Sequence, residues 1–98
     1  MASFSELIAI NKPVLIDFYA EWCGPCKIMS PVLKEVKDEL GESVSVIKID
    51  VDRNRELSQK FGIRGVPTFM IFRDGKQIWR QSGIVSKEEL ISKLRQAG

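Results

Sequence analysis

The hydrophobic pattern of this chain changes its period along the sequence. Val14–Tyr19 is an apolar, partly β-branched run of strand length, interrupted by the single acid Asp17, and Val44–Ile49 is a second predicted strand. The stretch between the two runs carries apolar residues four positions apart, at Ile28, Val32, Val36 and Leu40. With charged residues between them, this spacing predicts an amphipathic helix. A strand–helix–strand series favours parallel pairing of the strands through a right-handed crossover.

The second half of the chain predicts an antiparallel hairpin. Thr68–Phe72 and Gln77–Gln81 are two further strand-like runs, and Asp74-Gly75 between them is a pair typical of tight hairpin turns. No repeat, low-complexity tract or linker divides the chain. We therefore expect a single α/β domain over residues 1–98, with a mixed sheet of two parallel strands followed by the hairpin.

Three further helix starts follow from N-cap signatures. Ser3 and Glu6 have the spacing of a capping box, and so do Ser86 and Glu89, which predicts a short first helix and a last helix. Asp52 can cap another helix after the second strand. This order of elements implies that helices cover both faces of the sheet.

Composition excludes several classes of protein. The chain has 98 residues, of which 44% are apolar and 29% charged, as in ordinary soluble domains. Fifteen basic against thirteen acidic residues leave a net charge of +2, which gives no reason to expect a nucleic acid or an anionic membrane as partner. The N-terminus lacks the basic and long apolar regions of a signal peptide, so we expect a cytoplasmic protein, although a leader already removed would leave no trace. We also expect a monomer.

Histidine is absent, and cysteine occurs only at positions 23 and 26. A zinc site of cysteines and histidines and a histidine-dependent triad are therefore excluded, and we expect no metal site. Two cysteines also cannot form a disulfide-rich scaffold. Any chemistry that this chain performs points to Cys23 and Cys26.

The spacing of Cys23 and Cys26 suits thiol–disulfide exchange at a helix start. The N–H groups and the dipole at a helix N-terminus stabilise a thiolate, and Pro25 fits a first turn. We expect Cys23 to be the outer, attacking thiol and Cys26 a more enclosed thiol that resolves the mixed disulfide. Such a pair also occurs as half of a zinc knuckle, as a structural disulfide or as two buried thiols. The strand–helix–strand setting and the lack of a second ligand pair favour redox chemistry.

Two segments of the chain resemble the hallmark segments of the thioredoxin family. They are the stretch Asp17-Phe-Tyr-Ala-Glu-Trp-Cys-Gly-Pro-Cys-Lys27 and the stretch Gly62-Ile-Arg-Gly-Val-Pro-Thr68. The resemblance runs from about Phe4 to the C-terminus. It implies the thioredoxin fold, but only sixteen residues precede Asp17, so we expect four strands with about four helices and no counterpart of the family's first strand. Tyr19 replaces a tryptophan common in the family.

The resemblance implies roles for two charged residues. Asp17 would deprotonate the resolving thiol of Cys26, directly or through water. The alternative, a carboxylate on a solvated strand face, conflicts with a sheet covered on both sides, and a buried carboxylate has a raised pKa that suits proton transfer. Lys48 is similar to the family's lysine near this acid and would support Asp17. An exposed strand lysine without a role remains an equal alternative.

The resemblance also implies a substrate-binding surface around Cys23. Its predicted members come from separate segments: Trp22, Gly24, Pro25, Val66, Pro67, Gly83 and Ile84. The Val66–Pro67 bond would be cis and would turn the Val66 backbone towards an incoming chain, and Asp52 would orient Trp22. Taken singly, Trp22 could instead belong to the core, the glycines to turns and Pro67 to an ordinary strand start.

These features predict a protein-disulfide reductase of the thioredoxin type. Gly24-Pro25 lacks the histidine that oxidising relatives usually carry between their cysteines, which favours a reductant. The resemblance implies no bound cofactor, electrons from NADPH through a flavin-dependent thioredoxin reductase, and clients such as ribonucleotide reductase, peroxiredoxins and methionine sulfoxide reductases. Two alternatives remain open. One is a periplasmic or membrane-tethered reductant, and the other is a non-enzymatic binding module.

Overall fold

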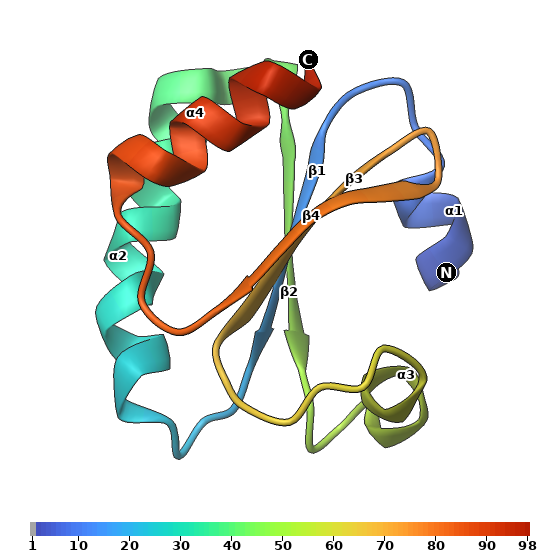
Figure 1. The fold of residues 1–98 in the computed structure, drawn as a ribbon, viewed down its shortest axis with the longest axis vertical. Helices are drawn as coiled ribbons and strands as arrows, with labels where there is room; N and C mark the ends of the chain where they lie inside the picture. The colour runs from blue at the N-terminus through green and yellow to red at the C-terminus, as the bar shows by residue number, and fades with distance from the viewer. Residues whose placement is uncertain (1) are drawn as a thin grey trace.

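The computed structural model describes residues 2–98 around a four-stranded mixed sheet (Figure 1). Its strands lie in the order β2-β1-β3-β4, with β1 (Val14–Tyr19) parallel to β2 (Ser45–Asp50). The hairpin strands β3 (Thr68–Arg73) and β4 (Lys76–Ser82) complete the sheet, and β3 is antiparallel to both of its neighbours. The expected number of strands and their directions are confirmed, and β2 lies one residue later than predicted.

Helices cover both faces of this sheet. The long helix α2 (Gly24–Leu40) and the C-terminal helix α4 (Lys87–Ala97) lie on one side, and the short helices α1 (Phe4–Ile8) and α3 (Arg55–Lys60) lie on the other (Figure 1). A single 3-10 turn, Gly41–Ser43, leads from α2 to β2. None of the helices in the described part of the chain is long and apolar enough to cross a membrane.

The alternation of side chains along β1 divides the core into two parts. Leu15 packs in the cluster that faces α2 and α4, whereas Ile16 and Phe18 pack in the cluster that faces α1 and α3. Because successive strand residues point to opposite faces, Asp17 and Tyr19 lie on the same face as Leu15, under α2. Strand β1 thus brings its acid to the side of the sheet that carries the cysteines.

The apolar stripe of α2 differs from its predicted course. The buried residues are Cys26, Met29, Leu33 and Val36, whereas Ile28 is 58% exposed. A strict four-residue spacing advances about 40° beyond a full turn at each step, so a line of such residues winds around the helix. Val36 of the predicted line reaches the sheet, and Ile28 at its start faces solvent.

The predicted caps are confirmed at two helices and wrong at the third. Glu6 N–H donates to Ser3 Oγ at 3.3 Å while Ser3 N–H donates to Glu6 Oε1 at 3.0 Å, which completes the first capping box. Ser86 Oγ accepts from Glu89 N–H at 3.1 Å at the start of α4. Helix α3 begins after Asn54 rather than Asp52, because the Asp52 side chain is engaged elsewhere, with Trp22.

The β3–β4 turn has the conformation that its sequence predicts. Asp74 has φ 52° and Gly75 has φ 83°, the two positive values that a type I′ turn requires. The backbone N–H of Gly75 donates to the carbonyl oxygen of Ile8 at 3.0 Å, so the turn rests on the end of α1. Trp79 on β4 is half-buried against the α2–α4 side of the core.

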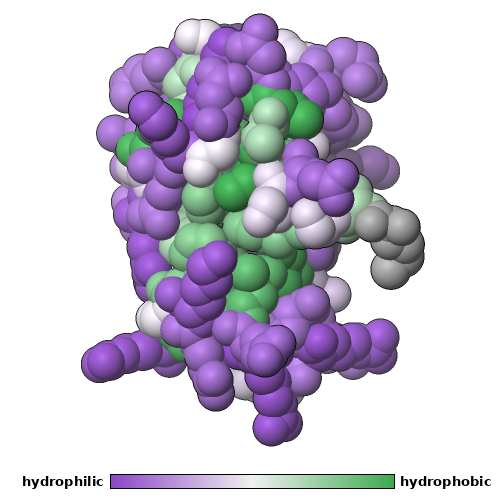
Figure 2. All heavy atoms as spheres, turned by 90° about the vertical axis from the view of Figure 1, so that its right-hand side faces the viewer, coloured by the Kyte–Doolittle hydropathy of each residue, from purple (hydrophilic) through white to green (hydrophobic). Residues whose placement is uncertain are grey.

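The two short helices cover their side of the sheet only in part. Figure 2 shows apolar atoms in the middle of this face, surrounded by polar side chains. The half-buried residues that pack on this side include Ile47, Leu57, Phe61 and Ile63. This face is remote from α2, and it contains neither of the cysteines.

Candidate active site

The cysteine pair occupies the junction of β1 and α2. Cys23 is the N-cap of α2, and its Sγ accepts a hydrogen bond from the Cys26 backbone N–H at 3.1 Å. The two residues form a disulfide with a Cα–Cα distance of 5.3 Å, and Pro25 lies in the first turn as expected. When the disulfide is reduced, the same N–H and the dipole of a 17-residue helix favour negative charge on the Cys23 sulfur.

Burial does not separate the two cysteines in the predicted way. Cys23 is 3% exposed and Cys26 is 5% exposed, so Cys23 is not the more open residue of the disulfide form. The physical reason lies in their surroundings. The Cys23 Sγ lies 3.5 Å from the carbonyl oxygen of Val66, which comes from a different segment, whereas Cys26 contributes to the wall of a small surface pocket of about 220 Å³.

The segment before β3 meets the cysteines through its backbone. The Val66–Pro67 peptide bond is cis, as the family resemblance implied. The carbonyl oxygen of Pro67 accepts a hydrogen bond from Gly83 N–H at 2.8 Å. Gly83 has φ 90°, a value that favours glycine, so its turn brings Ile84 alongside this segment. The predicted segments therefore converge around Cys23.

An exposed apolar surface surrounds the disulfide. Trp22 is 70% exposed and Ile84 is 57% exposed, which excludes the core placement of Trp22. The indole Nε1 of Trp22 donates to Asp52 Oδ2 at 2.8 Å, so Asp52 holds the ring as predicted. Gly24 and Pro25 are also exposed beside Cys23.

Ile28 extends this surface, a position that the apolar pattern of the sequence did not predict. It lies four residues after Gly24 in α2, and residues at this spacing are neighbours on a helix surface. Its exposed side chain thus continues the apolar surface one turn along the helix. Ile28 could have been identified by counting one helical turn from Gly24 instead of assigning it to the apolar stripe that faces the sheet.

Asp17 is buried without a partner on the cysteine-bearing side of the sheet. It is 1% exposed, and neither carboxylate oxygen accepts a hydrogen bond from any described residue. Burial raises its pKa from 3.8 to about 6, against a smaller lowering by the positive charge of Lys48. A carboxyl group with this pKa accepts and releases protons near neutral pH, and the solvated strand face is excluded as its environment.

Lys48 lies beside Asp17 without forming an ion pair with it in residues 2–98. The two residues are partners in the parallel register of β1 and β2, so their side chains lie on the same face. The Lys48 Nζ lies 4.8 Å from the centre of the Tyr19 ring and 3.4 Å from Ser30 Oγ. Its side chain is exposed, so its effect on Asp17 acts through the charge rather than through contact.

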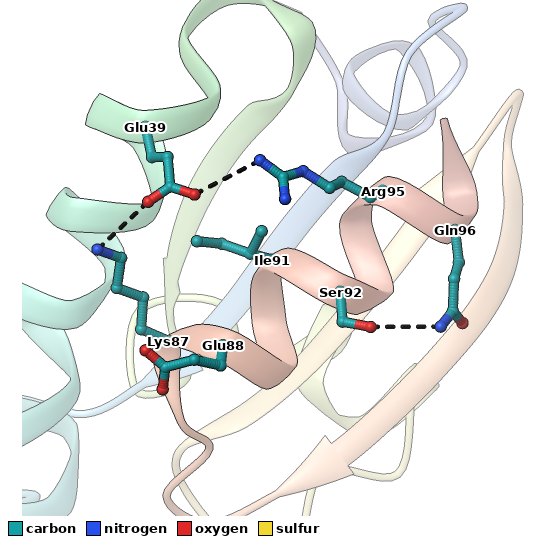
Figure 3. Close-up of a pocket in the computed structure, with 7 residues that line it drawn as sticks. All are labelled: Glu39, Lys87, Glu88, Ile91, Ser92, Arg95 and Gln96. Atoms are coloured by element: carbon teal, nitrogen blue, oxygen red, sulfur yellow. Dashed lines mark hydrogen bonds and ion pairs between the residues drawn. The ribbon is translucent and has the colours of Figure 1, made fainter.

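A depression of about 580 Å³ near α4 offers no comparable chemistry (Figure 3). Its one α2 residue, Glu39, pairs with Lys87 at 3.3 Å and with Arg95 at 3.5 Å. These ion pairs tie the C-terminal end of α2 to α4, whereas the cysteines lie at the opposite end of α2.

Comparison with known proteins gives consistent matches over nearly the whole chain. The family model described as Thioredoxin matches residues 1–96. The chain is 46% identical over 94 residues to a thioredoxin of Pyropia yezoensis, which covers 95% of this chain and 88% of that protein. It is 42% identical over 97 residues to the chloroplastic thioredoxin Y of Oryza sativa subsp. japonica, covering 98% of this chain but only 58% of that protein's length.

A solved structure shares the fold. A mutant thioredoxin from Halobacterium salinarum NRC-1 superposes with a TM-score of 0.86 at 36% sequence identity, over 99% of this chain and 87% of that one. The four strands and flanking helices described above are therefore arranged in the thioredoxin fold.

Proposed function

This chain belongs to the thioredoxin family of protein disulfide oxidoreductases, and we propose that it acts as a reductant of protein disulfides. One observation supports the proposal above all others. The Cys23 sulfur caps a helix, where it accepts the Cys26 N–H, and this is the position at which a thiolate is most stabilised.

The reaction proceeds through two exchanges of disulfide bonds. The Cys23 thiolate attacks one sulfur of a client disulfide, which forms a mixed disulfide and releases the other client sulfur as a thiolate. Cys26 then loses its proton and attacks Cys23 Sγ. The Cys23–Cys26 disulfide forms, the second client sulfur leaves, and each client thiolate takes up a proton. The client gains two electrons, and the cysteine pair loses them.

Asp17 supplies the base for the second exchange. Its pKa of about 6 leaves most of the group deprotonated at pH 7 while it remains far more basic than an ordinary aspartate. It accepts the Cys26 proton, directly or through water, and passes it on as the client leaves. Lys48 supports this step through its positive charge, which also favours the thiolate of Cys26.

The apolar surface around Cys23 receives the client. Seven residues form it: Trp22, Gly24, Pro25, Val66, Pro67, Gly83 and Ile84. An extended client segment lies over the glycines, which allow its backbone to approach closely, and pairs with the backbone of Val66. Because this surface has little charge of its own, it suits many client sequences rather than one.

The remaining features of the proposal come from the family. Residues 1–98 act as one domain and a monomer in the cytoplasm, without a bound cofactor. A flavin-dependent thioredoxin reductase returns the disulfide to the dithiol with electrons from NADPH, so the protein maintains cell redox homeostasis. Its clients are enzymes such as ribonucleotide reductase, peroxiredoxins and methionine sulfoxide reductases. The absence of a histidine between the cysteines supports the reducing direction.

Insulin reduction tests the proposal. With dithiothreitol as electron donor, the protein is expected to accelerate the precipitation of insulin chains, and the substitution Cys23→Ser is expected to abolish the acceleration. Folded wild-type protein that lacks activity, although both cysteines react with a thiol reagent after reduction, would indicate a binding module instead.

A further inference from the structure

The Lys48 ammonium group has several potential partners nearby: Asp17, Tyr19 and Ser30. Its residue is the register partner of Asp17, and Tyr19 lies two positions further along β1 on the same face. The buried carboxylate of Asp17 has no hydrogen-bond partner in the described residues, so the ammonium group of a neighbouring lysine would ordinarily be drawn to it. In the structure the ammonium lies over the Tyr19 ring, at 4.8 Å, and beside Ser30 Oγ, at 3.4 Å.

The same groups surround a pocket next to the resolving cysteine. Tyr19, Ser30 and Lys48 line it together with Cys26, and its volume is about 220 Å³. Tyr19 comes from β1 and Ser30 from α2, so two elements hold the positive charge that Lys48 of β2 carries. The ring of Tyr19 supplies a cation–π contact, and the serine oxygen supplies a hydrogen-bond acceptor.

We propose that Tyr19 and Ser30 form a clamp that holds the Lys48 ammonium beside the Cys26 pocket and away from an ion pair with Asp17. The clamp makes Tyr19 and Ser30 positioning residues, and its importance for turnover rests on the proposed function. An ammonium in contact with Asp17 would stabilise the carboxylate and weaken it as a base. Held at the pocket, the same charge leaves Asp17 basic and favours the Cys26 thiolate.

Lys48 is the charged residue whose position matters most for Asp17. On the other side of Asp17 in the sheet, β3 contributes the apolar Phe69, and the packed faces of α2 and α4 above it contribute hydrophobic side chains. Besides Tyr19 and Lys48, the wall of the adjacent pocket carries the titratable or charged residues Glu21, Cys26 and Lys27. None of these three forms a hydrogen bond or an ion pair with Asp17 in the described residues, and Lys48 is the charge that lowers its pKa.

The clamp is tested by measuring the pKa of Asp17 in the oxidised protein, from the carbon-13 shift of its carboxyl group across pH. Tyr19→Leu removes the ring and is expected to lower this pKa by about one unit, because Lys48 then approaches the carboxylate. Ser30→Ala is expected to lower it by a smaller amount. Tyr19→Phe keeps the ring and is the matched control, with a pKa equal to that of the wild type.

Repeating the measurement in a Lys48→Met protein distinguishes an effect of the clamp on the Asp17 pKa from an effect of greater exposure of Asp17 to water. If Lys48 is the cause, Tyr19→Leu has no effect on the pKa in a Lys48→Met protein, whereas Lys48→Met alone raises it. A lowering by Tyr19→Leu that persists without Lys48 would overturn the clamp, as would an unchanged pKa in both single variants. The titration needs no activity, so the clamp and the reductase proposal fail independently: the first by this titration, the second by the insulin assay.

Discussion

The Trp22 indole donates a hydrogen bond from Nε1 to Oδ2 of Asp52 across 2.8 Å. The two residues follow different strands, β1 and β2, and thirty positions separate them. The parallel pairing of these strands brings their carboxyl ends together, so a residue that follows β2 can hold the ring beside the disulfide. A large, 70% exposed aromatic side chain is thereby kept in one orientation at the proposed client surface.

Loss of this hydrogen bond is expected to weaken client binding. Asp52→Ala frees the Trp22 ring, and a contribution of about 1 kcal/mol corresponds to a roughly fivefold rise in KM for insulin. The rate with a small aromatic disulfide, which needs little of the surface, is expected to stay unchanged. Asp52→Asn retains an acceptor and serves as control. An equal loss with both substrates would contradict this role.

Replacement of the buried acid is expected to slow the resolving step. Asp17→Asn cannot accept the Cys26 proton, so insulin reduction at pH 7 is expected to fall by at least about tenfold. Wild-type activity is expected to decline as the pH falls through about 6, where Asp17 becomes protonated, and the variant is expected to lack this decline. Turnover and a pH profile identical to those of the wild type would exclude the role.

The same carboxyl group makes stability depend on pH. Its pKa is raised from 3.8 to about 6 in the folded protein, so the folded state binds the proton more tightly than the unfolded chain. The free energy of unfolding therefore falls as the pH rises from about 4 to about 6, by about 3 kcal/mol in total, and stays at the lower value above that.

Urea unfolding of the oxidised protein at pH 4, 5 and 7 measures this fall. The Asp17→Asn variant removes the titrating group, so its unfolding free energy is expected to change less over the same range. A wild-type protein that gains stability between pH 4 and pH 6 relative to the variant would show that the pKa of Asp17 is not raised.

The sequence predicted the architecture well because its signals are local. The Ser3–Glu6 capping box and the Asp74-Gly75 turn each depend on residues that are close in sequence, and both form as predicted. The helix cap predicted at Asp52 and the inward position predicted for Ile28 are wrong because the surroundings of both residues are set by tertiary contacts. The Asp52 carboxylate accepts a hydrogen bond from the distant Trp22 indole instead of capping a helix. The face of α2 that meets the sheet is determined by packing rather than by the spacing of apolar residues.

The members of the candidate site could be proposed from the sequence, but their contacts could not. The resemblance supplied Cys23, Cys26 and Asp17 by position. It could not supply the burial of both cysteines, which depends on Val66 from another segment, nor the placement of Lys48 against Tyr19. Such contacts depend on side-chain conformations across three elements of the fold.

Ile28 offers a test of how far the client surface extends. Ile28→Ser is expected to raise KM for insulin about two- to fivefold through lost apolar contact, with little change in the free energy of unfolding. Ile78→Ser is the matched control, because Ile78 is similarly exposed, at 49%, but lies on β4. Equal effects of the two substitutions on KM would place Ile28 outside the surface.

Trapping of the first intermediate tests the order of attack. In Cys26→Ser the mixed disulfide between Cys23 and a client cannot be resolved, so a stable adduct is expected on non-reducing gels, with reduced and alkylated client as the negative control. Cys23→Ser is expected to form much less adduct, because its remaining thiol is not the helix-capping sulfur. More adduct through Cys26 than through Cys23 would reverse the two roles.

The reduction potential of the Cys23–Cys26 pair bears most directly on the proposed direction of electron flow. Equilibration with defined ratios of reduced and oxidised dithiothreitol, followed by alkylation and mass determination, gives its value. For a reductant without a histidine between its cysteines, we expect a potential near about −270 mV, the value typical of thioredoxin. A potential near about −120 mV, typical of a strong oxidant, would contradict the assignment of this protein as a reductant of protein disulfides.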